Sequence, residues 1–222
     1  MFFHSISSLI IFLPIIFLSY SFFQNLNKKF ANIFLLLFSL FFYSFDIPWF
    51  IIPLLISAIS DYFISRNLIK KNYKTQSYKY LLLGLSLFIN IGLLTIFKYN
   101  ILISNLFNLL FDKFNFGDVT TIILPAGISF YTFQTLSFTI DSFQNKIKKS
   151  PKFYDYLLYV CYFPQLVAGP ILRPKDFFDS NLEPKLNKNN IEFKNGFNRI
   201  CYGLFLKLCL ADELANLNDI AY

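Results

Sequence analysis

The chain has 222 residues, of which 55% are hydrophobic and 15% are charged, and its formal net charge is +7. A soluble globular domain carries about 25% charged residues, so this composition argues against one, and it excludes a disordered chain, a collagen and a disulfide-rich secreted domain. The mean hydropathy of +0.50 agrees with that conclusion. The basic residues lie in gaps between apolar runs, as they do in membrane proteins, and this spacing argues against binding to nucleic acid.

The first four apolar runs predict membrane-spanning helices. A helix needs about 20 mostly apolar residues to cross a bilayer. Residues 2–23 form such a run, with no basic segment before it and no small-residue cleavage site after it, so we interpret it as a retained span and not as a signal peptide. Further runs cover residues 30–45, 47–64 and 80–97, and Pro48 marks the start of the third.

The apolar runs that follow are less regular. Residues 101–114 are short and carry polar side chains, which favours a helix that lies in the membrane interface. Residues 121–140 predict a fifth span, interrupted by Pro125 and Gly127. The last stretch, residues 196–222, has a helical pattern with charged residues inside it.

Basic residues alternate between the two sides of these spans. They are frequent after the first, third and fifth spans and sparse in the other connections, and the basic loops contain Lys28, Lys29, Arg66, Lys70, Lys71, Lys74, Lys79, Lys146, Lys148, Lys149 and Lys152. Because the basic loops of membrane proteins stay in the cytoplasm, the pattern predicts an N-terminus that faces outward.

Residues 154–172 break this alternation, because basic residues flank the apolar segment on both sides. An ordinary span would place the second group of basic residues outside. A re-entrant segment, which enters the membrane and returns, would keep both groups inside, and Pro164, Gly169 and Pro170 prevent one continuous helix here. Broken backbone at membrane depth occurs where protein or a water-filled cavity surrounds it. We therefore favour re-entry over a kinked ordinary span.

Together these patterns predict an all-α polytopic membrane protein with about five to seven membrane helices and one re-entrant segment. No repeat, flexible linker or change in composition divides the chain, so residues 1–222 are predicted to form a single membrane domain. This fold class makes the lipid bilayer the first expected partner.

Motifs for hydrolysis, nucleotide binding and metal catalysis are absent from the sequence. Ser129 is followed two residues later by Tyr131, where a nucleophile elbow needs glycine. His4 is the only histidine, which leaves a metal site without a second histidine and a catalytic triad without a base. The three cysteines form no CxxC pair, so neither a disulfide framework nor a zinc site is expected.

A few polar side chains lie within the apolar runs. Asp61 and Asp141 are carboxylates near the ends of predicted spans, where water can solvate them, so a structural role is at least as well supported as a functional one. Gln134 and Gln165 carry no titratable charge. They can orient a substrate or bind helices to one another, and the second role is the commoner one.

Three blocks of sequence follow one another along the second half of the chain. The first is LPAGISFYTFQTLS at residues 124–137, with Asp141 after it, and the second is YFPQLVAGPILR at residues 162–173. The third covers residues 196–215, with GFNR, GLFLK and ADELA in order. These blocks resemble the membrane-bound O-acyltransferase family, in the branch of the alginate O-acetylation proteins and peptidoglycan O-acetyltransferases. The resemblance covers essentially the whole chain but only the first half of a typical family member.

The resemblance implies a funnel through the membrane, along which an acyl group from the cytoplasmic side reaches an acceptor hydroxyl on the outer side. The implied activity is O-acetyl transfer to a cell-surface polysaccharide or to peptidoglycan, in a bacterial-type inner membrane. The acyl donor would be a substrate, such as acetyl-CoA or an acyl carrier, and not a bound cofactor. A periplasmic acetyltransferase could complete the transfer as a partner.

The resemblance also implies that the catalytic centre lies elsewhere. The family's catalytic histidine belongs to a Trp-His-Gly-like motif in the second half, whereas Trp49 and His4 are the only tryptophan and histidine here and are not adjacent. Activation of a hydroxyl needs a base with a pKa near the working pH, and histidine supplies one. We therefore expect the N-terminal portion of a larger acyltransferase fold, a truncated and inactive fragment with no catalytic residue and no metal site.

Three residues are candidates for lining the substrate path, namely Gln134, Gln165 and Arg173. Arg173 suits an anionic acyl donor by charge, but it suits lipid head groups as well, and the second interpretation is favoured. The missing histidine leaves an alternative function open, a non-catalytic membrane scaffold or transfer subunit. A transporter is a weaker third hypothesis, because the broken helix has no paired repeat beside it.

Overall fold

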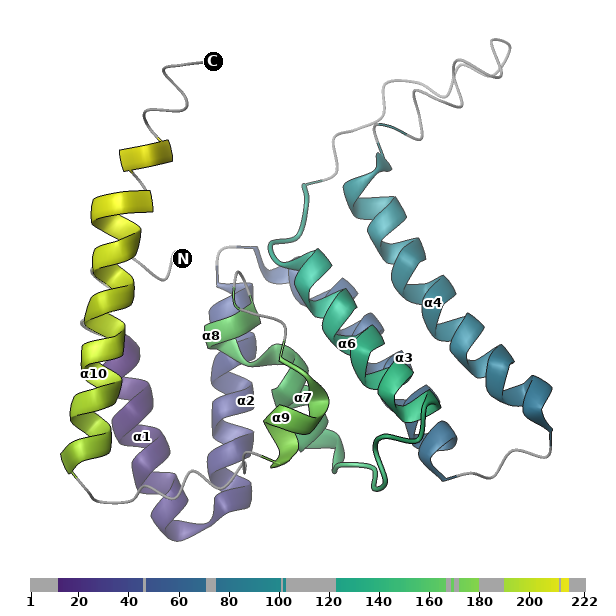
Figure 1. The fold of residues 1–222 in the computed structure, drawn as a ribbon, viewed down its shortest axis with the longest axis horizontal. Helices are drawn as coiled ribbons and strands as arrows, with labels where there is room; N and C mark the ends of the chain where they lie inside the picture. Colours follow the sequence, from purple (N-terminus) through teal and green to yellow (C-terminus); the bar gives the residue numbers. More distant parts are fainter. Residues whose placement is uncertain are drawn as a thin grey trace. The chain divides into compact units, whose positions relative to one another are not determined.

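The computed structural model describes residues 12–45, 47–70, 75–100, 102, 123–166, 169, 172–179, 190–211 and 213–215. Every regular element in these residues is a helix, which confirms the predicted all-α class (Figure 1). The chain forms two compact units, the first over Ile16–Leu182 and the second over Phe2–Ile15 and Glu183–Tyr222. That the chain forms a single membrane domain stays a prediction. The expected interfacial helix at residues 101–114 lies outside the described residues, apart from Leu102.

Helices α1 (Leu13–Leu26) and α2 (Lys28–Ser44) follow each other with a single residue between them. That residue, Asn27, has an extended backbone, and its side-chain oxygen accepts a hydrogen bond of 2.8 Å from the backbone N–H of Lys29. Asparagine is a favoured N-cap because it satisfies a donor that the first turn of a helix leaves without a partner. The two helices correspond to the first two predicted spans, and the beginning of the first span lies outside the described residues.

Among the described residues, two helices are long enough and apolar enough to cross a membrane: α3 (Ile51–Ile69), with the 3-10 turn η2 (Pro48–Phe50) before it, and α4 (Gln76–Lys98). At about 1.5 Å per residue, α3 and α4 are about 28 and 35 Å long, which compares with a bilayer core of about 30 Å. Pro48 stands at the first position of η2, where its missing N–H costs nothing. Helix α3 extends beyond the predicted end near residue 64, because polar residues continue the helix after its apolar part.

Helix α6 (Ile128–Phe143) begins later than the predicted fifth span. Gly127, at its N-cap, has a φ of 74°, a left-handed conformation that glycine adopts without steric cost. Pro125 has no N–H to donate, so a helix cannot continue through it without losing a hydrogen bond. The hydroxyl of Tyr43 on α2 donates a hydrogen bond of 2.8 Å to the carbonyl of Ala126 in this turn. The turn at residues 125–127 therefore sets where α6 begins.

The segment predicted to be broken is broken. Helix α7 (Phe153–Cys161) ends before Tyr162, and α8 (Phe163–Leu166) is a single turn. Helix α9 (Pro174–Asp179) follows. The prediction that residues 154–172 do not form one continuous helix is confirmed.

The core of the first unit joins these helices through buried aromatic and aliphatic side chains. Helices α3, α4 and α6 pack against one another, and α2 packs against α7 and α8 (Figure 1). Phe163 of α8 packs edge to face against Phe38 and Phe42 of α2. Phe138 of α6 packs in the same way on Tyr156 of α7. These contacts anchor α7 and α8 in the core of the unit.

The second unit contains α10 (Asn190–Phe205), which a π-helical turn (Leu206–Ala211) continues. This helix begins before residue 196, where the sequence predicts the last helical stretch. The described side chains of residues 194–211 are exposed, apart from the half-buried Leu204.

Candidate functional site

A network of polar side chains lies between α3, α4 and α6. At its centre, the carboxyl of Asp61 on α3 accepts hydrogen bonds from the hydroxyl of Ser86 at 2.6 Å and from the amide of Asn90 at 2.9 Å, both on α4. The amide oxygen of Asn90 accepts hydrogen bonds from Ser57 on α3 at 2.6 Å and from Thr135 on α6 at 3.2 Å. All five side chains are fully buried, so the network joins the three helices without contact with the surroundings.

The spacing of these residues along the chain explains why they meet. Residues four positions apart lie on the same face of a helix. Each helix carries such a polar stripe: Ser57, Asp61 and Ser65 on α3, Ser86 and Asn90 on α4, and Thr135 and Thr139 on α6. The hydroxyls of Ser65 and Thr139 lie 3.0 Å apart and extend the network by one turn. Sequence analysis missed this network, although the repeat of polar residues within apolar runs was its visible signal.

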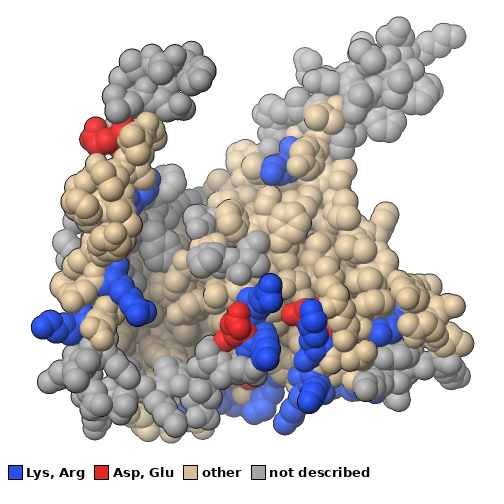
Figure 2. Space-filling model, viewed as in Figure 1, with Lys and Arg blue, Asp and Glu red and all other residues tan. Residues whose placement is uncertain are grey.

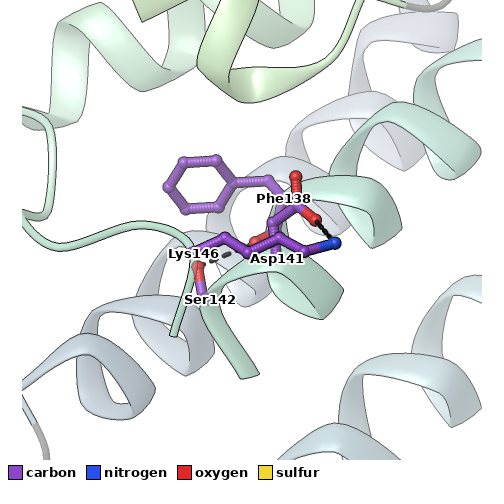
Figure 3. A network of polar contacts seen from close by, with 4 residues as sticks. All are labelled: Phe138, Asp141, Ser142 and Lys146. Carbon is purple, nitrogen blue, oxygen red and sulfur yellow. Dashed lines mark hydrogen bonds and ion pairs between the residues drawn. The ribbon is translucent and has the colours of Figure 1, made fainter. Parts of the chain in front are cut away.

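The two carboxylates expected near span ends have different surroundings. The expectation for Asp61 was wrong, because α3 continues to Ile69 and the carboxyl lies about two turns before its end, fully buried. Asp141 lies at the end of α6 with its side chain 18% exposed and pairs with Lys146 at 3.5 Å (Figure 3). Beside it, the hydroxyl of Ser142 donates a hydrogen bond of 2.7 Å back to the carbonyl of Phe138 (Figure 3).

The two candidate glutamines meet at one atom. The side-chain amides of Gln134 on α6 and Gln165 on α8 both donate hydrogen bonds to the backbone carbonyl of Tyr159, at 2.5 and 2.9 Å. Tyr159 belongs to the last turn of α7, where the carbonyls of a helix have no partner within the helix. Both glutamines are buried, and together they cap the broken end of α7. The other side-chain atom of Gln165, its oxygen, is buried with no hydrogen-bond partner in the described part of the chain.

After α8 the chain reverses its direction. The hydroxyl of Tyr159 donates a hydrogen bond of 2.9 Å to the carbonyl of Leu172, and its ring packs against Phe177 of α9. Helix α9 therefore lies beside the α7 residues that precede the break. We call residues 153–179 the α7–α9 hairpin.

The hairpin depends on a close approach at Gly169. The backbone N–H of Gly169 donates a hydrogen bond of 3.0 Å to the carbonyl of Gln165. A Cβ atom at this position would lie 2.3 Å from the Cα of Gln165, a distance that real Cβ atoms do not show. Glycine is therefore the residue that the turn admits.

Arg173, the third candidate for the substrate path, lies apart from the two glutamines. Its side chain is exposed just before α9, and its carbonyl accepts the hydrogen bond of 3.1 Å from Phe177 that begins that helix. The structure thus brings Gln134 and Gln165 together and leaves Arg173 at the surface. That these residues line a substrate path stays a prediction. His4 lies outside the described residues, which contain no group of three or more potential metal ligands among His, Cys, Asp and Glu.

One end of the first unit carries most of its described basic residues. There α3, α4 and α6 meet at Leu68, Leu82 and Phe143, and Asn32 near the start of α2 donates a hydrogen bond of 3.0 Å to Asp155 near the start of α7. The basic side chains that flank these helix ends are those of Lys28, Lys29, Arg66, Lys70, Lys79, Lys146, Lys148, Lys149 and Lys152. Figure 2 shows lysine and arginine gathered at the lower edge of this unit, with a mostly uncharged surface above. We call this the basic end.

The first unit differs from a soluble protein in its surface and in the polar network inside its core. Its polar network is buried, whereas large apolar side chains point outward, with Phe88 and Leu81 of α4 exposed by 77% and 62%. In a bilayer, polar groups must find hydrogen-bond partners inside the bundle, whereas apolar side chains can face the lipid. This distribution is typical of a helical membrane protein.

Comparison with known proteins identifies relatives along most of the chain. A peptidoglycan O-acetyltransferase of Helicobacter pylori is 34% identical and covers 95% of this chain and 44% of its own length. Probable alginate O-acetylases AlgI of Pseudomonas putida and Pseudomonas aeruginosa are 30% and 31% identical, each over 87% of this chain, and over 40% and 37% of their own lengths. No protein-family model and no solved structure matches the chain.

The chain therefore belongs to the membrane-bound O-acyltransferase family, in the branch of these peptidoglycan and alginate O-acetylases. It spans less than half of the length of these relatives. This agrees with the expectation that it corresponds to one half of a typical family member.

Proposed function

We propose that this chain is part of a membrane-bound O-acetyltransferase that modifies a polysaccharide or the peptidoglycan of the cell surface. The observation that carries the proposal is the 34% identity with a peptidoglycan O-acetyltransferase, which extends over 95% of the chain. The buried polar network and the apolar exterior support it, because this transfer takes place across a membrane and needs a stable bundle there.

The arrangement in the membrane follows from the basic end. We infer about five to seven membrane helices and one re-entrant segment in a bacterial-type inner membrane, with the basic end in the cytoplasm. Helix α2 starts at this end, α3 ends there, α4 starts there and α6 ends there. With Lys28 and Lys29 at the turn between α1 and α2, the start of α1 faces outward.

The α7–α9 hairpin is the re-entrant segment in this arrangement. Helix α7 begins beside Tyr62 of α3, whose hydroxyl donates a hydrogen bond of 3.4 Å to the carbonyl of Pro151 at the basic end. The contact between Tyr159 and Leu172 brings the chain back along α7. Both flanks of the hairpin then remain on the cytoplasmic side, as their lysines require.

The chain would contribute the donor side of the reaction. An acyl donor such as acetyl-CoA, or an acyl carrier, approaches from the cytoplasm as a substrate and not as a resident cofactor. Gln134 and Gln165 fix the hairpin at membrane depth, and Arg173 supplies a positive charge that suits the donor's phosphates or lipid head groups. A periplasmic acetyltransferase is the partner proposed for the outer side.

This chain alone should not transfer acetyl groups. Activation of an acceptor hydroxyl needs a general base near the operating pH, and His4 is the only histidine of the sequence. We therefore propose that the chain is inactive alone and that the catalytic base belongs to the second half of the acyltransferase fold.

A chimera tests the proposal. This chain would replace the matching part of the Helicobacter pylori relative, in a strain that lacks that relative, and acetyl esters on the peptidoglycan would be measured. We expect the chimera to restore the esters and the chain alone to give none. A chimera that reaches the membrane in normal amount and restores no ester would contradict the proposal.

The alternative is a non-catalytic scaffold or transfer subunit, which the missing histidine favours. In that case the chimera would be inactive, whereas the chain alone, expressed together with the intact relative, would change the yield of esters. The same strain therefore separates the two functions.

A further inference from the structure

The carboxyl of Asp61 is the group at the centre of the first unit that the proposed function does not use. It is fully buried, and its two oxygens accept hydrogen bonds from Ser86 and Asn90 on α4. The hydroxyls of Thr135 and Thr139 on α6 also lie close enough to interact with it. A carboxylate at membrane depth is costly unless a positive charge accompanies it, and a buried acid without one tends to stay neutral.

The charged and titratable groups around Asp61 supply no such charge. On α3, Arg66 is exposed, and on α4 the ammonium of Lys79 lies over the ring of Phe143, 4.4 Å from its centre. On α6, Asp141 pairs with a lysine at the surface. From α7, the buried hydroxyl of Tyr156 is near enough to interact electrostatically. Among the described residues, no ion pair includes Asp61.

Helix α4 depends on this carboxyl for its place in the bundle. Its buried side chains are Lys79, Leu82, Ser86 and Asn90, which form a single narrow stripe. Two of these four bind Asp61 directly. Apolar contacts between helices gain little in lipid, because lipid tails are as apolar as the side chains, so polar contacts carry a large share of the attachment.

We propose that Asp61 binds a proton in the assembled bundle and that this proton keeps α4 attached to α3 and α6. Without the proton, the buried negative charge would be stabilised by water, and water can reach it only if α4 moves away. The site is thus a proton-binding device within the first unit, and it is independent of acetyl transfer.

The hydrogen bonds indicate where the proton resides. The amide of Asn90 uses both of its hydrogens, one for Oδ2 of Asp61 and one for the carbonyl of Ser86, each at 2.9 Å. Oδ2 is therefore an acceptor in either charge state. The proton, taken from water, forms its O–H bond at Oδ1, in the 2.6 Å contact with the Ser86 hydroxyl. The hydrogen of Ser86 then turns to a backbone carbonyl of its own helix, as serines in helices commonly do.

The test uses the full chain in detergent and compares three variants. Asp61→Asn has the shape of the neutral acid, Asp61→Ala removes the group, and Asp141→Asn makes the same change at a partly exposed carboxyl. In mildly acidic buffer we expect Asp61→Asn to unfold within about 2 °C of the unchanged chain and Asp61→Ala to unfold more than about 4 °C lower. Because the folded state holds the proton, the unchanged chain and Asp141→Asn should lose stability as the pH rises, and Asp61→Asn should lose less.

An infrared measurement on the unchanged chain gives a second readout that does not depend on how a variant folds. A neutral carboxylic acid has a C=O stretching band that shifts in heavy water. We expect this band in mildly acidic buffer in the unchanged chain and in Asp141→Asn, and its loss in Asp61→Asn. The proposal is overturned if the unchanged chain lacks a band that Asp61→Asn removes, or if Asp61→Asn keeps the full dependence of stability on pH.

Discussion

At the scale of single residues, the carbonyl of Tyr159 explains why two glutamines lie inside an apolar bundle. A helix that ends within the protein leaves carbonyls without partners, and each buried polar group without a partner costs free energy. The amides of Gln134 and Gln165 come from different helices and satisfy the same oxygen. Loss of one glutamine therefore leaves the Tyr159 carbonyl with one donor, whereas loss of both leaves it with neither.

Substitution of both glutamines should show this shared role. We expect Gln134→Leu and Gln165→Leu each to lower the free energy of unfolding by about 1 kcal/mol. The double variant should lose about 1–3 kcal/mol more free energy of unfolding than the sum of the two single losses, because it leaves the Tyr159 carbonyl without a donor. Unfolding in detergent measures these values, with Gln144→Leu as a control at an exposed site. Additivity within about 0.5 kcal/mol would contradict the shared role.

Gly169 provides a second test at this scale. A methyl group there would lie 2.3 Å from the backbone of Gln165, so the hairpin must shift to accept it. We expect Gly169→Ala to destabilise the chain by at least about 1–3 kcal/mol. The control is Gly92→Ala in α4, where nothing lies within 4 Å and alanine should gain up to about 1 kcal/mol. Equal thermal midpoints for the two variants would show that the turn is not as close as described.

At the scale of elements, the sequence predicts most helices and the break but not their exact limits. Apolar runs locate α2, α3 and α4 because membrane helices need such runs, and two prolines with a glycine locate the break after α7. The ends of the helices are less predictable. Helix α3, for example, continues through polar residues, because other helices cover some of those residues. The Asp61 network could not be placed from the sequence without knowing which helices pack together, although its spacing of four residues was visible.

The α7–α9 hairpin leads to a prediction about sides of the membrane. In a background with Cys201→Ser and Cys209→Ser, single cysteines would be introduced as Lys149→Cys before α7, Lys175→Cys in α9 and Lys98→Cys at the end of α4. A thiol reagent that cannot cross the membrane should label the first two from the same side. The third should be labelled from the other side. Labelling of positions 149 and 175 from opposite sides would mean an ordinary span.

At the scale of the whole molecule, the first unit combines a polar network inside its core with an apolar exterior. This arrangement is stable because lipid, unlike water, neither competes for hydrogen bonds nor penalises apolar surface. The family could be inferred from three sequence blocks, and the relatives bear it out. The composition alone predicts a membrane protein, but it does not predict which polar residues of the chain pair with one another.

A substitution at Phe88 separates this arrangement from a soluble one. Phe88 is 77% exposed on α4, and the sequence places it near the middle of that helix. We expect Phe88→Lys to cost about 2.5–3.5 kcal/mol in membrane insertion, whereas Phe88→Leu should have little effect. The fraction of chain that resists carbonate extraction from membranes measures insertion. Greater solubility and unchanged folding of Phe88→Lys would contradict a lipid-facing α4.

The single residue between α1 and α2 also has a consequence for biosynthesis. Asn27 leaves no slack between the two helices, and its side chain already caps the second one. With so short a connection, we expect neither helix to be inserted without the other. We expect the pair to enter a membrane as one helical hairpin, with Lys28 and Lys29 at its tip.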